Sequence, residues 1–311
     1  MLKLIQNEWM KLWAKKGSWI MLVLILLIAL FPSAIEQFTD LNDYEEDPNW
    51  KTSLQADIDN NKEILKESPE DAAFYEERIA IGEYRLANDL APNNDGQTTE
   101  SYIEYGVSLI GIISFFAVII GASIVSNEFS TGTIKMLLTR PVSRAKILTS
   151  KLLTVFLYGI VLYIAAVFLS YIVGVVVYDG TTEPTLVYEN GKVIEKSFIA
   201  DVAYTSLLMS ADFIMTILFA FMIGSVFRSS SLAIGLTLII SFMTALIVGF
   251  FNRYEFVKYI WITHSNLTQH KNGVLLVEGI TMQMSLIVLG VYAVIFTAIS
   301  YLVFMKRDIT A

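Results

Sequence analysis

The sequence predicts an all-α polytopic membrane protein. Of its 311 residues, 55% are hydrophobic and only 17% are charged, whereas soluble domains average about 45–50% apolar and about 25% charged residues. The mean hydropathy is +0.57. The apolar residues are concentrated in runs of roughly twenty, the length that crosses a hydrocarbon core about 30 Å thick. This pattern argues against a soluble enzyme, a nucleic-acid-binding module and a disordered tail.

Six membrane-spanning helices are expected, at 18–35, 102–126, 152–177, 202–227, 232–251 and 282–305. Between and beside them the sequence predicts an N-terminal helix at 1–17, an acidic insert at 36–101, a loop at 127–151, further loops at 178–201 and 252–281, and a tail at 306–311. The chain has no cysteine and only two histidines, which excludes disulfides and thiolate sites and leaves no metal site to predict.

The distribution of lysine and arginine predicts the orientation. The two termini, the loop at 127–151 and the turn at 228 together hold 12 basic residues and three acidic ones. The insert at 36–101 holds 18 acidic residues and 5 basic ones. Both termini and the basic loop are therefore expected in the cytoplasm, and the acidic insert outside.

The N-terminal residues 2–16 have the pattern of an amphipathic helix lying in the inner membrane interface. Trp9 and Trp13 belong to its apolar stripe, while Lys11 lies largely on the opposite face, toward anionic lipid. A topogenic anchor is the simpler alternative. A cleaved signal peptide is another, although the apolar run is longer than such peptides use.

The acidic insert is expected to form a small helical hairpin outside the membrane. One amphipathic helix would begin near Trp50, and the second would follow the capping sequence at 68–71 and stop near Pro92. Its acidic charge suggests either attraction of a cationic peptide or ion, or simply a solvated surface that enforces topology. Residues 189–192 suggest a second hairpin, within the loop at 178–201.

The cytoplasmic loop has the pattern of a docking surface. Gly132 interrupts the entering helix, residues 133–138 suggest a short amphipathic helix, and Pro141 ends it because proline disfavours helix in the residue before it. The loop is too short for an independent domain and too regularly patterned for a passive linker.

This loop resembles the signature of ABC-2-type permeases, the membrane subunits of ABCG-like ABC exporters. The resemblance is carried by Glu128, Gly132, Thr133, Ile134, Lys135, Leu138, Arg140, Pro141 and Arg144. At the N-terminus, Glu8, Trp9 and Lys11 match the opening of such chains, and Trp13 follows. The acidic insert departs from the compact ABCG pattern.

The resemblance implies a transport subunit of the bacterial plasma membrane and no enzyme activity in this chain. Two copies of a separate ATPase would bind ATP and Mg²⁺ and dock on the loop and the N-terminal helix, and a second permease copy, identical or similar, would complete the exporter. The chain itself has no G-x-x-x-x-G-K-[ST] match. The exported substrate would be an antibiotic or peptide, a lipid-like molecule or an ion, as in multidrug or peptide resistance.

Asp212 is the one ionisable residue well inside a predicted span, which makes it a candidate for the translocation path. A cap or kink near the interface is the simpler interpretation. An ion-gradient-driven transporter using Asp212 is an alternative function, and so is a non-transporting sensor or anchor. An intramembrane hydrolase would need paired acids with histidine in the bilayer, and the sequence offers none.

Overall fold

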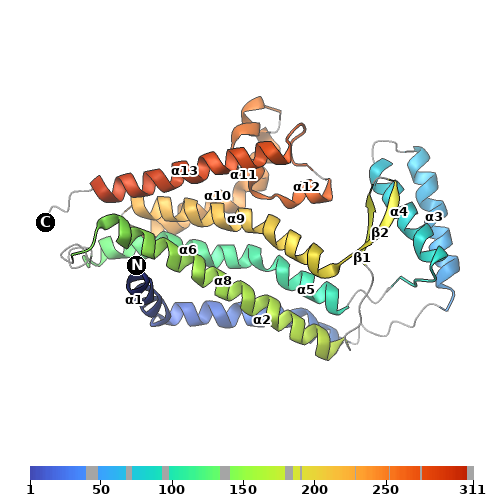
Figure 1. The fold of residues 1–311 in the computed structure, drawn as a ribbon, viewed down its shortest axis with the longest axis horizontal. Coiled ribbons are helices and arrows are strands. Elements are labelled where there is room, and N and C mark those ends of the chain that lie inside the picture. The colour runs from blue at the N-terminus through green and yellow to red at the C-terminus, as the bar shows by residue number, and fades with distance from the viewer. Residues whose placement is uncertain are drawn as a thin grey trace. The chain divides into compact units, whose positions relative to one another are not determined.

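The computed structural model describes residues 1–39, 48–67, 72–92, 98–133, 141–178, 185–189, 191–227, 229–251, 253–273 and 275–306. Its helices and strands, in chain order, are α1 (Leu2–Trp13), α2 (Lys16–Thr39), α3 (Trp50–Glu67), α4 (Ala72–Ala87), α5 (Thr99–Ser108), α6 (Ile110–Ser130), α8 (Arg144–Val177), β1 (Thr185–Glu189), β2 (Lys192–Lys196), α9 (Phe198–Val226), α10 (Ser230–Phe251), η2 (Glu255–Tyr259), α11 (Trp261–Ser265), α12 (Thr268–Asn272) and α13 (Met282–Lys306) (Figure 1).

Long apolar helices dominate the described chain, as the sequence predicts for a polytopic membrane protein. Five stretches are long and apolar enough to cross a membrane: 16–35, 99–130, 144–177, 198–226 and 282–306. Where a sixth span is expected, α10 is apolar over Ser230–Met243. These helices begin earlier or end later than the predicted spans, because polar turns at their ends continue the helix beyond the apolar run.

The chain divides into two compact units. The first contains residues 1–28, 107–167 and 205–311, and the second contains residues 29–106 and 168–204. In the first unit, a core of apolar side chains joins α9, α10 and α13 to the segment between η2 and residue 277, with Phe219 and Trp261 at its centre. Much of the outer surface of α8, α10 and α13 is apolar, as on Phe168, Phe250 and Val294. Lipid-facing helices require such a surface.

Helices α6 and α9 approach one another closely because small residues lie where they meet. A Cβ atom at Gly121 would lie 3.6 Å from the Cβ of Ala220, an ordinary contact. A Cβ atom at Gly224 would collide with the carbonyl oxygen of Ala122. The Ala220–Gly224 spacing therefore serves helix packing.

The second unit contains the acidic insert. Helices α3 and α4 pack as a hairpin around Ile58, which is buried beneath Gly82. Strands β1 and β2 pair antiparallel in the register Glu189↔Lys192, so the hairpin suggested at 189–192 is confirmed. The fold is thus helical except for this two-stranded sheet among the described residues.

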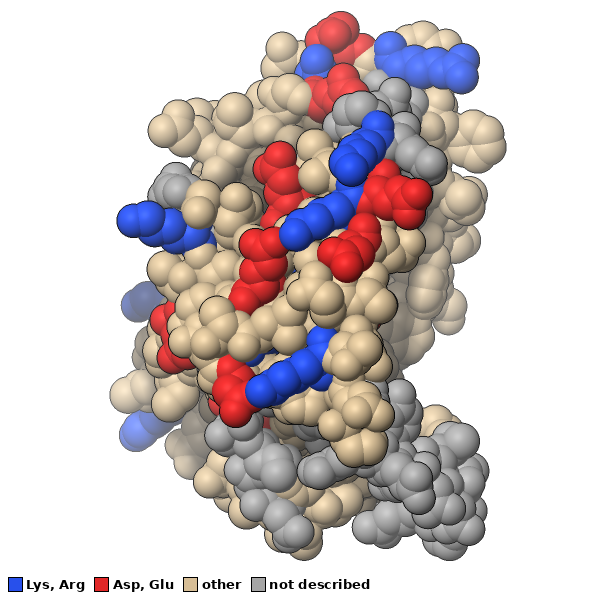
Figure 2. Space-filling view, turned by 90° about the vertical axis from the view of Figure 1, so that its right-hand side faces the viewer, with Lys and Arg blue, Asp and Glu red and all other residues tan. Residues whose placement is uncertain are grey.

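Acidic and basic side chains are interspersed on the face of this unit shown in Figure 2. Two ion pairs tie its elements together: Lys62 to Glu83 at 2.7 Å and Lys51 to Asp89 at 2.5 Å. Among the described residues of the insert, acidic side chains are therefore partly paired with basic ones.

The segment at 252–281, expected to be an outer connection, contains the short helices η2, α11 and α12. Side chains of these helices pack against the helices of the first unit, and His264 is completely buried. With five residues each, these helices are too short to show an apolar period in the sequence.

Candidate functional site

Helix α1 packs with a polar residue on its buried face. Glu8 is 5% exposed and Leu12 is also 5% exposed, whereas Leu2 is 82% exposed. The buried face therefore shares Leu12 with the predicted apolar stripe but also includes Glu8, because this charged side chain has a partner inside the protein.

That partner is Lys151, which is 1% exposed near the start of α8. Its Nζ atom lies 2.7 Å from Oε2 of Glu8 and 2.8 Å from Oε1 of Glu128 on α6. Lys11 completes the cluster, with its Nζ atom 3.2 Å from Glu8 and 3.3 Å from Glu128. Two carboxylates and two ammonium groups alternate, so the cluster is formally neutral and each buried charge has an opposite neighbour.

This ion-pair network, comprising Glu8, Lys11, Glu128 and Lys151, joins three helices that are far apart in the sequence. The sequence predicts Lys11 on a face toward anionic lipid, and Glu8 and Glu128 on elements where a partner docks. In the structure the carboxylates of Glu8 and Glu128 point largely into the protein, and Lys11, whose side chain is 45% exposed, pairs with both. Lys151 was not singled out. The sequence did contain a sign of this pairing. The segments predicted in the cytoplasm hold 12 basic residues and only three acidic ones, two of which are Glu8 and Glu128. Each of these two carboxylates is therefore expected to pair with a basic side chain.

Aromatic packing fixes α1 at the same place. The Trp13 ring contacts those of Trp9, Trp19 and Tyr158, with centroids 5.7, 4.8 and 5.5 Å away. Tyr158 donates a hydrogen bond to the Ser18 carbonyl at 2.7 Å. Trp13, predicted to lie among lipid headgroups, therefore packs against protein.

The described ends of the loop at 127–151 form hydrogen bonds with the helices. Thr133 donates a hydrogen bond to Glu128, and Gly132 adopts a left-handed conformation with φ of 72° where α6 ends. At the other end, Pro141 is exposed, and Arg144 donates to the Met305 carbonyl at the end of α13 at 3.0 Å. The predicted short helix and its residues Ile134, Lys135, Leu138 and Arg140 lie outside the described residues.

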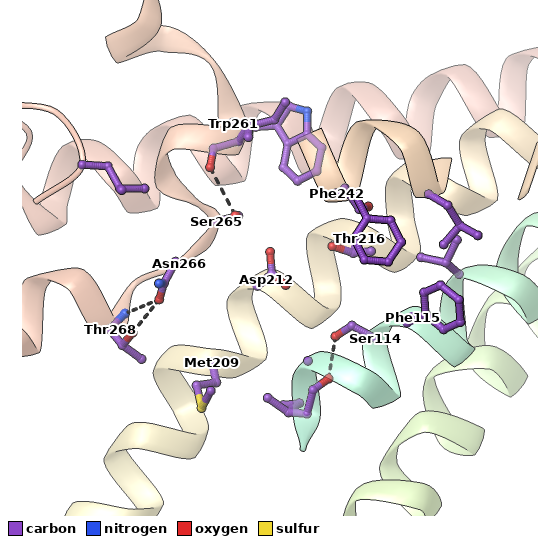
Figure 3. A pocket seen from close by; sticks show the side chains of 17 residues that line it. Ser114, Phe115, Met209, Asp212, Thr216, Phe242, Trp261, Ser265, Asn266 and Thr268 are labelled. Atoms are coloured by element: carbon purple, nitrogen blue, oxygen red, sulfur yellow. Dashed lines mark hydrogen bonds between the residues drawn. The ribbon is translucent and has the colours of Figure 1, made fainter. Parts of the chain in front are cut away.

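Asp212 lies midway along α9, fourteen residues from each of its ends. It lines a cavity of about 580 Å³, within the size range of ligand pockets. Figure 3 shows Asp212 pointing from α9 toward Ser265, whose hydroxyl donates a hydrogen bond to the Ile262 carbonyl at 3.2 Å. Among the described residues that line this cavity, Asp212 alone has an ionisable side chain.

We call this cavity the Asp212 pocket. Its remaining walls come from four other parts of the first unit. Helix α6 contributes Ser114 and Phe115, α10 contributes Phe242, α11 contributes Trp261, and the segment beyond it contributes polar groups of Asn266 and Thr268. The rings of Phe115 and Phe242 pack with centroids 5.9 Å apart. The pocket is thus mostly apolar and aromatic, with one carboxylate.

A series of hydrogen bonds through two histidines holds α11 against this pocket. The Nε2 atom of His264 lies 2.8 Å from the Lys258 carbonyl, which can only accept, so Nε2 carries the proton. Its Nδ1 atom therefore accepts from Ser285 at 2.8 Å, and His270 donates to the same hydroxyl at 2.9 Å. Burial lowers the pKa of His264, and the nearby His270 lowers it further. A neutral His264 thus positions the helix that carries Ser265.

The described residues contain no group of three or more side chains suited to holding a metal ion. The chemistry available at the two sites is therefore ion pairing at the network, and hydrogen bonding and charge at Asp212.

Comparison with known proteins assigns a family without an activity. A family model described as "Protein of unknown function (DUF2705)" matches residues 83–310. The chain is 36% identical over 318 residues to "Uncharacterized protein YhcI" of Bacillus subtilis (strain 168), with 99% of each chain covered. It is 28% identical over 211 residues to "Uncharacterized membrane protein YdbK" of the same organism, covering 67% of this chain and 82% of the relative. No solved structure matches. The apolar helices and the second relative together indicate a membrane protein.

Proposed function

The chain belongs to the DUF2705 family, and on the geometry described above we propose that it is the membrane-spanning permease subunit of an ABC exporter. ATP would be hydrolysed by a separate ATPase, of which two copies dock on the loop at 127–151 and on α1. The observation that carries this proposal is the ion-pair network, which joins α1 to both helices that flank the loop.

The network gives a docked partner a rigid connection to the membrane helices. Because Lys151 bonds Glu8 and Glu128 at once, a force applied to α1 or to the loop acts on α6 and α8 together. Arg144 extends the connection to α13 through the Met305 carbonyl. Closure of two ATPases could then move the helices as a body and alternate access to the two sides of the membrane.

The proposed layout has six spans, with α10 as the fifth, and both termini in the cytoplasm of a bacterial cell. A second copy of the permease, or a similar chain, would complete the translocation path. ATP and Mg²⁺ would bind to the partner alone, in keeping with the lack of a P-loop sequence in this chain. A transport subunit of this kind would not be an enzyme by itself.

Co-purification tests the proposal. The tagged chain is extracted from its native cells in mild detergent, and the bound proteins are identified and assayed for ATP hydrolysis. We expect a stoichiometric P-loop ATPase. Reversing the charge of the loop with Arg140→Glu should release it, whereas Lys192→Glu, an equal charge change at the exposed turn between β1 and β2, should not. An intact complex without an ATPase would contradict the proposal.

The absence of cysteine from the sequence makes the proposed orientation directly testable. Single cysteines at Lys3 on α1 and Lys192 on β2, both exposed, are treated in intact cells with a membrane-impermeant maleimide. We expect labelling at position 192 and protection at position 3. Equal labelling of both would overturn the assignment of the termini to the cytoplasm.

A gradient-driven transporter is the second candidate, and the position of Asp212 halfway along α9 favours it. A carboxylate deep in a helix bundle can carry a proton or a cation across the membrane. This candidate predicts transport by the chain alone in vesicles with an ion gradient and without ATP. The exporter predicts none under those conditions.

A further inference from the structure

The Asp212 pocket combines one carboxylate with a large apolar surface. Nine of the described residues that line it have large apolar side chains, and its volume is about 580 Å³. Six others supply only hydroxyl or amide groups, and no lysine, arginine or histidine is among the described lining residues. The pocket therefore holds a carboxyl group for which the described lining residues supply no basic partner.

An uncompensated charge in an apolar environment is costly, so it selects an opposite charge or a proton. The Ser265 hydroxyl, toward which Asp212 points, carries no charge and donates to the Ile262 carbonyl. The surrounding rings favour a cation with an organic body over a bare metal ion, because the faces of Phe and Trp attract cations and their surfaces pack against apolar groups. A small metal ion would instead need several oxygen ligands around it.

We propose that the Asp212 pocket binds a monovalent organic cation with an apolar body, whose charged centre lies beside the Asp212 carboxylate. Phe115 and Phe242 form one wall against the apolar part of this ligand. Trp261 is held rigidly at another wall by its contacts with Phe219 and Phe296, at 5.5 and 5.7 Å. Identification of this ligand class as the exported substrate rests on the function proposed above, whereas the binding itself does not.

Binding is measured on the full-length chain, purified without partners into nanodiscs of zwitterionic phosphatidylcholine. The probes are tetraphenylphosphonium and tetraphenylborate, which have nearly the same size and shape and opposite charges, and empty nanodiscs give the background. We expect saturable binding of tetraphenylphosphonium at one site per chain. Equal binding of the two probes, or none of the cation, would overturn the proposal.

Variants locate the site. Asp212→Asn, which removes the charge but keeps the shape, should weaken cation binding at least about tenfold, since the loss of one partner of a desolvated charge pair has effects of this size or greater. Asp212→Glu should retain binding. Asp201→Asn makes the same change on the same helix outside the pocket lining and should leave binding unchanged. Undiminished binding by Asp212→Asn would refute the assignment.

An aromatic variant keeps the test decisive if Asp212→Asn does not yield folded protein. Phe242 is 73% exposed, so Phe242→Leu removes a ring without opening the core, and it should weaken cation binding about threefold or more. Phe250→Leu on the same helix is the matched control, because Phe250 is 78% exposed and does not line the pocket. Equal binding by these two variants would count against the site.

The outcomes separate this inference from the proposed exporter. Cation binding with no co-purified ATPase would uphold the pocket and contradict the exporter. A co-purified ATPase with no binding of the cation would do the reverse. Loss of transport in Asp212→Asn without any binding of tetraphenylphosphonium would assign Asp212 to proton transfer and overturn the inference.

Discussion

The ion-pair network and the Asp212 pocket differ in whether their carboxyl groups are paired with basic side chains. In the network, Glu8 and Glu128 each meet Lys151 at 2.7 and 2.8 Å, and Lys11 bridges both. In the pocket, Asp212 points toward a serine and has no cation among the described lining residues. Both sites adjoin cavities, of about 730 and 580 Å³.

The difference distinguishes structural charge from charge that is available to a ligand. A neutral, fully paired cluster holds helices together and has nothing left to bind. A lone carboxylate contributes little to the fold, and its cost is tolerated where a ligand or proton can offset it. The following predictions test whether the two sites differ in this way.

The largest effect is expected for Lys151→Met. Two buried carboxylates would lose their central cation, which should lower the free energy of unfolding by about 3–5 kcal/mol. Thermal denaturation and size-exclusion chromatography of the purified variant measure this loss. Lys146→Met, a change of an exposed lysine on the same helix, should be nearly neutral. Adding Glu8→Gln and Glu128→Gln to Lys151→Met should restore part of the stability; no restoration would show that the network is not a charge-paired unit.

The contact between α6 and α9 links the two sites, since α6 carries Glu128 and α9 carries Asp212. Gly224→Ala places a methyl group against the Ala122 carbonyl and should lower the free energy of unfolding by about 1–3 kcal/mol. The same measurement on Gly249→Ala should show no loss, because a Cβ atom there meets nothing within 4 Å. Similar stability of the two variants would mean that the helices do not meet at Gly224.

As the pH falls, protonation of His264 should destabilise the packing of α11 beside the Asp212 pocket before it affects the ion-pair network. The lowered pKa of His264 means that, below about pH 6.5, the unfolded chain binds a proton that the folded chain does not. Stability from this group is therefore present above that pH and lost as the pH falls, with a slope of at most about 1.4 kcal/mol per pH unit.

Thermal midpoints between pH 7.5 and 5 measure this effect. His264→Asn should lower the midpoint at neutral pH but reduce its dependence on pH, because the titrating ring is gone. His270→Gln, which removes the other histidine in this series of hydrogen bonds, should retain more of the dependence of the thermal midpoint on pH. An unchanged pH profile in His264→Asn would exclude His264 as the source.

The smallest effect on the fold is expected at the unpaired carboxylate. Asp212→Asn should leave the free energy of unfolding within about 1 kcal/mol of the wild type, or raise it, because the described residues that line the pocket include no base to pair with this carboxyl group. Denaturation of this variant is compared with that of Glu128→Gln, which should be clearly destabilised. A large loss of stability in Asp212→Asn would show that Asp212 is structural after all.

The class of the protein and many of its elements follow from local patterns in the amino-acid sequence. Runs of apolar residues indicate membrane helices because hydrocarbon thickness sets their length. The β-hairpin was predictable because Gly191 readily adopts the positive φ, here 78°, that its turn needs. The helical hairpin around Ile58 follows from a period of apolar residues in two neighbouring segments. All of these are local properties of the chain.

Which charges pair with one another depends on the packing of distant segments. Glu8 and Lys151 are 143 residues apart in sequence, and no periodicity links them. Likewise, α11 folds against α13 and brings Ser265 to Asp212, although its five residues are too few to predict a buried helix. The physical reason is that helix packing, through close contacts such as Gly224 with Ala122, sets these distances. Whether a carboxylate is paired or left for a ligand therefore depends on which helices become neighbours.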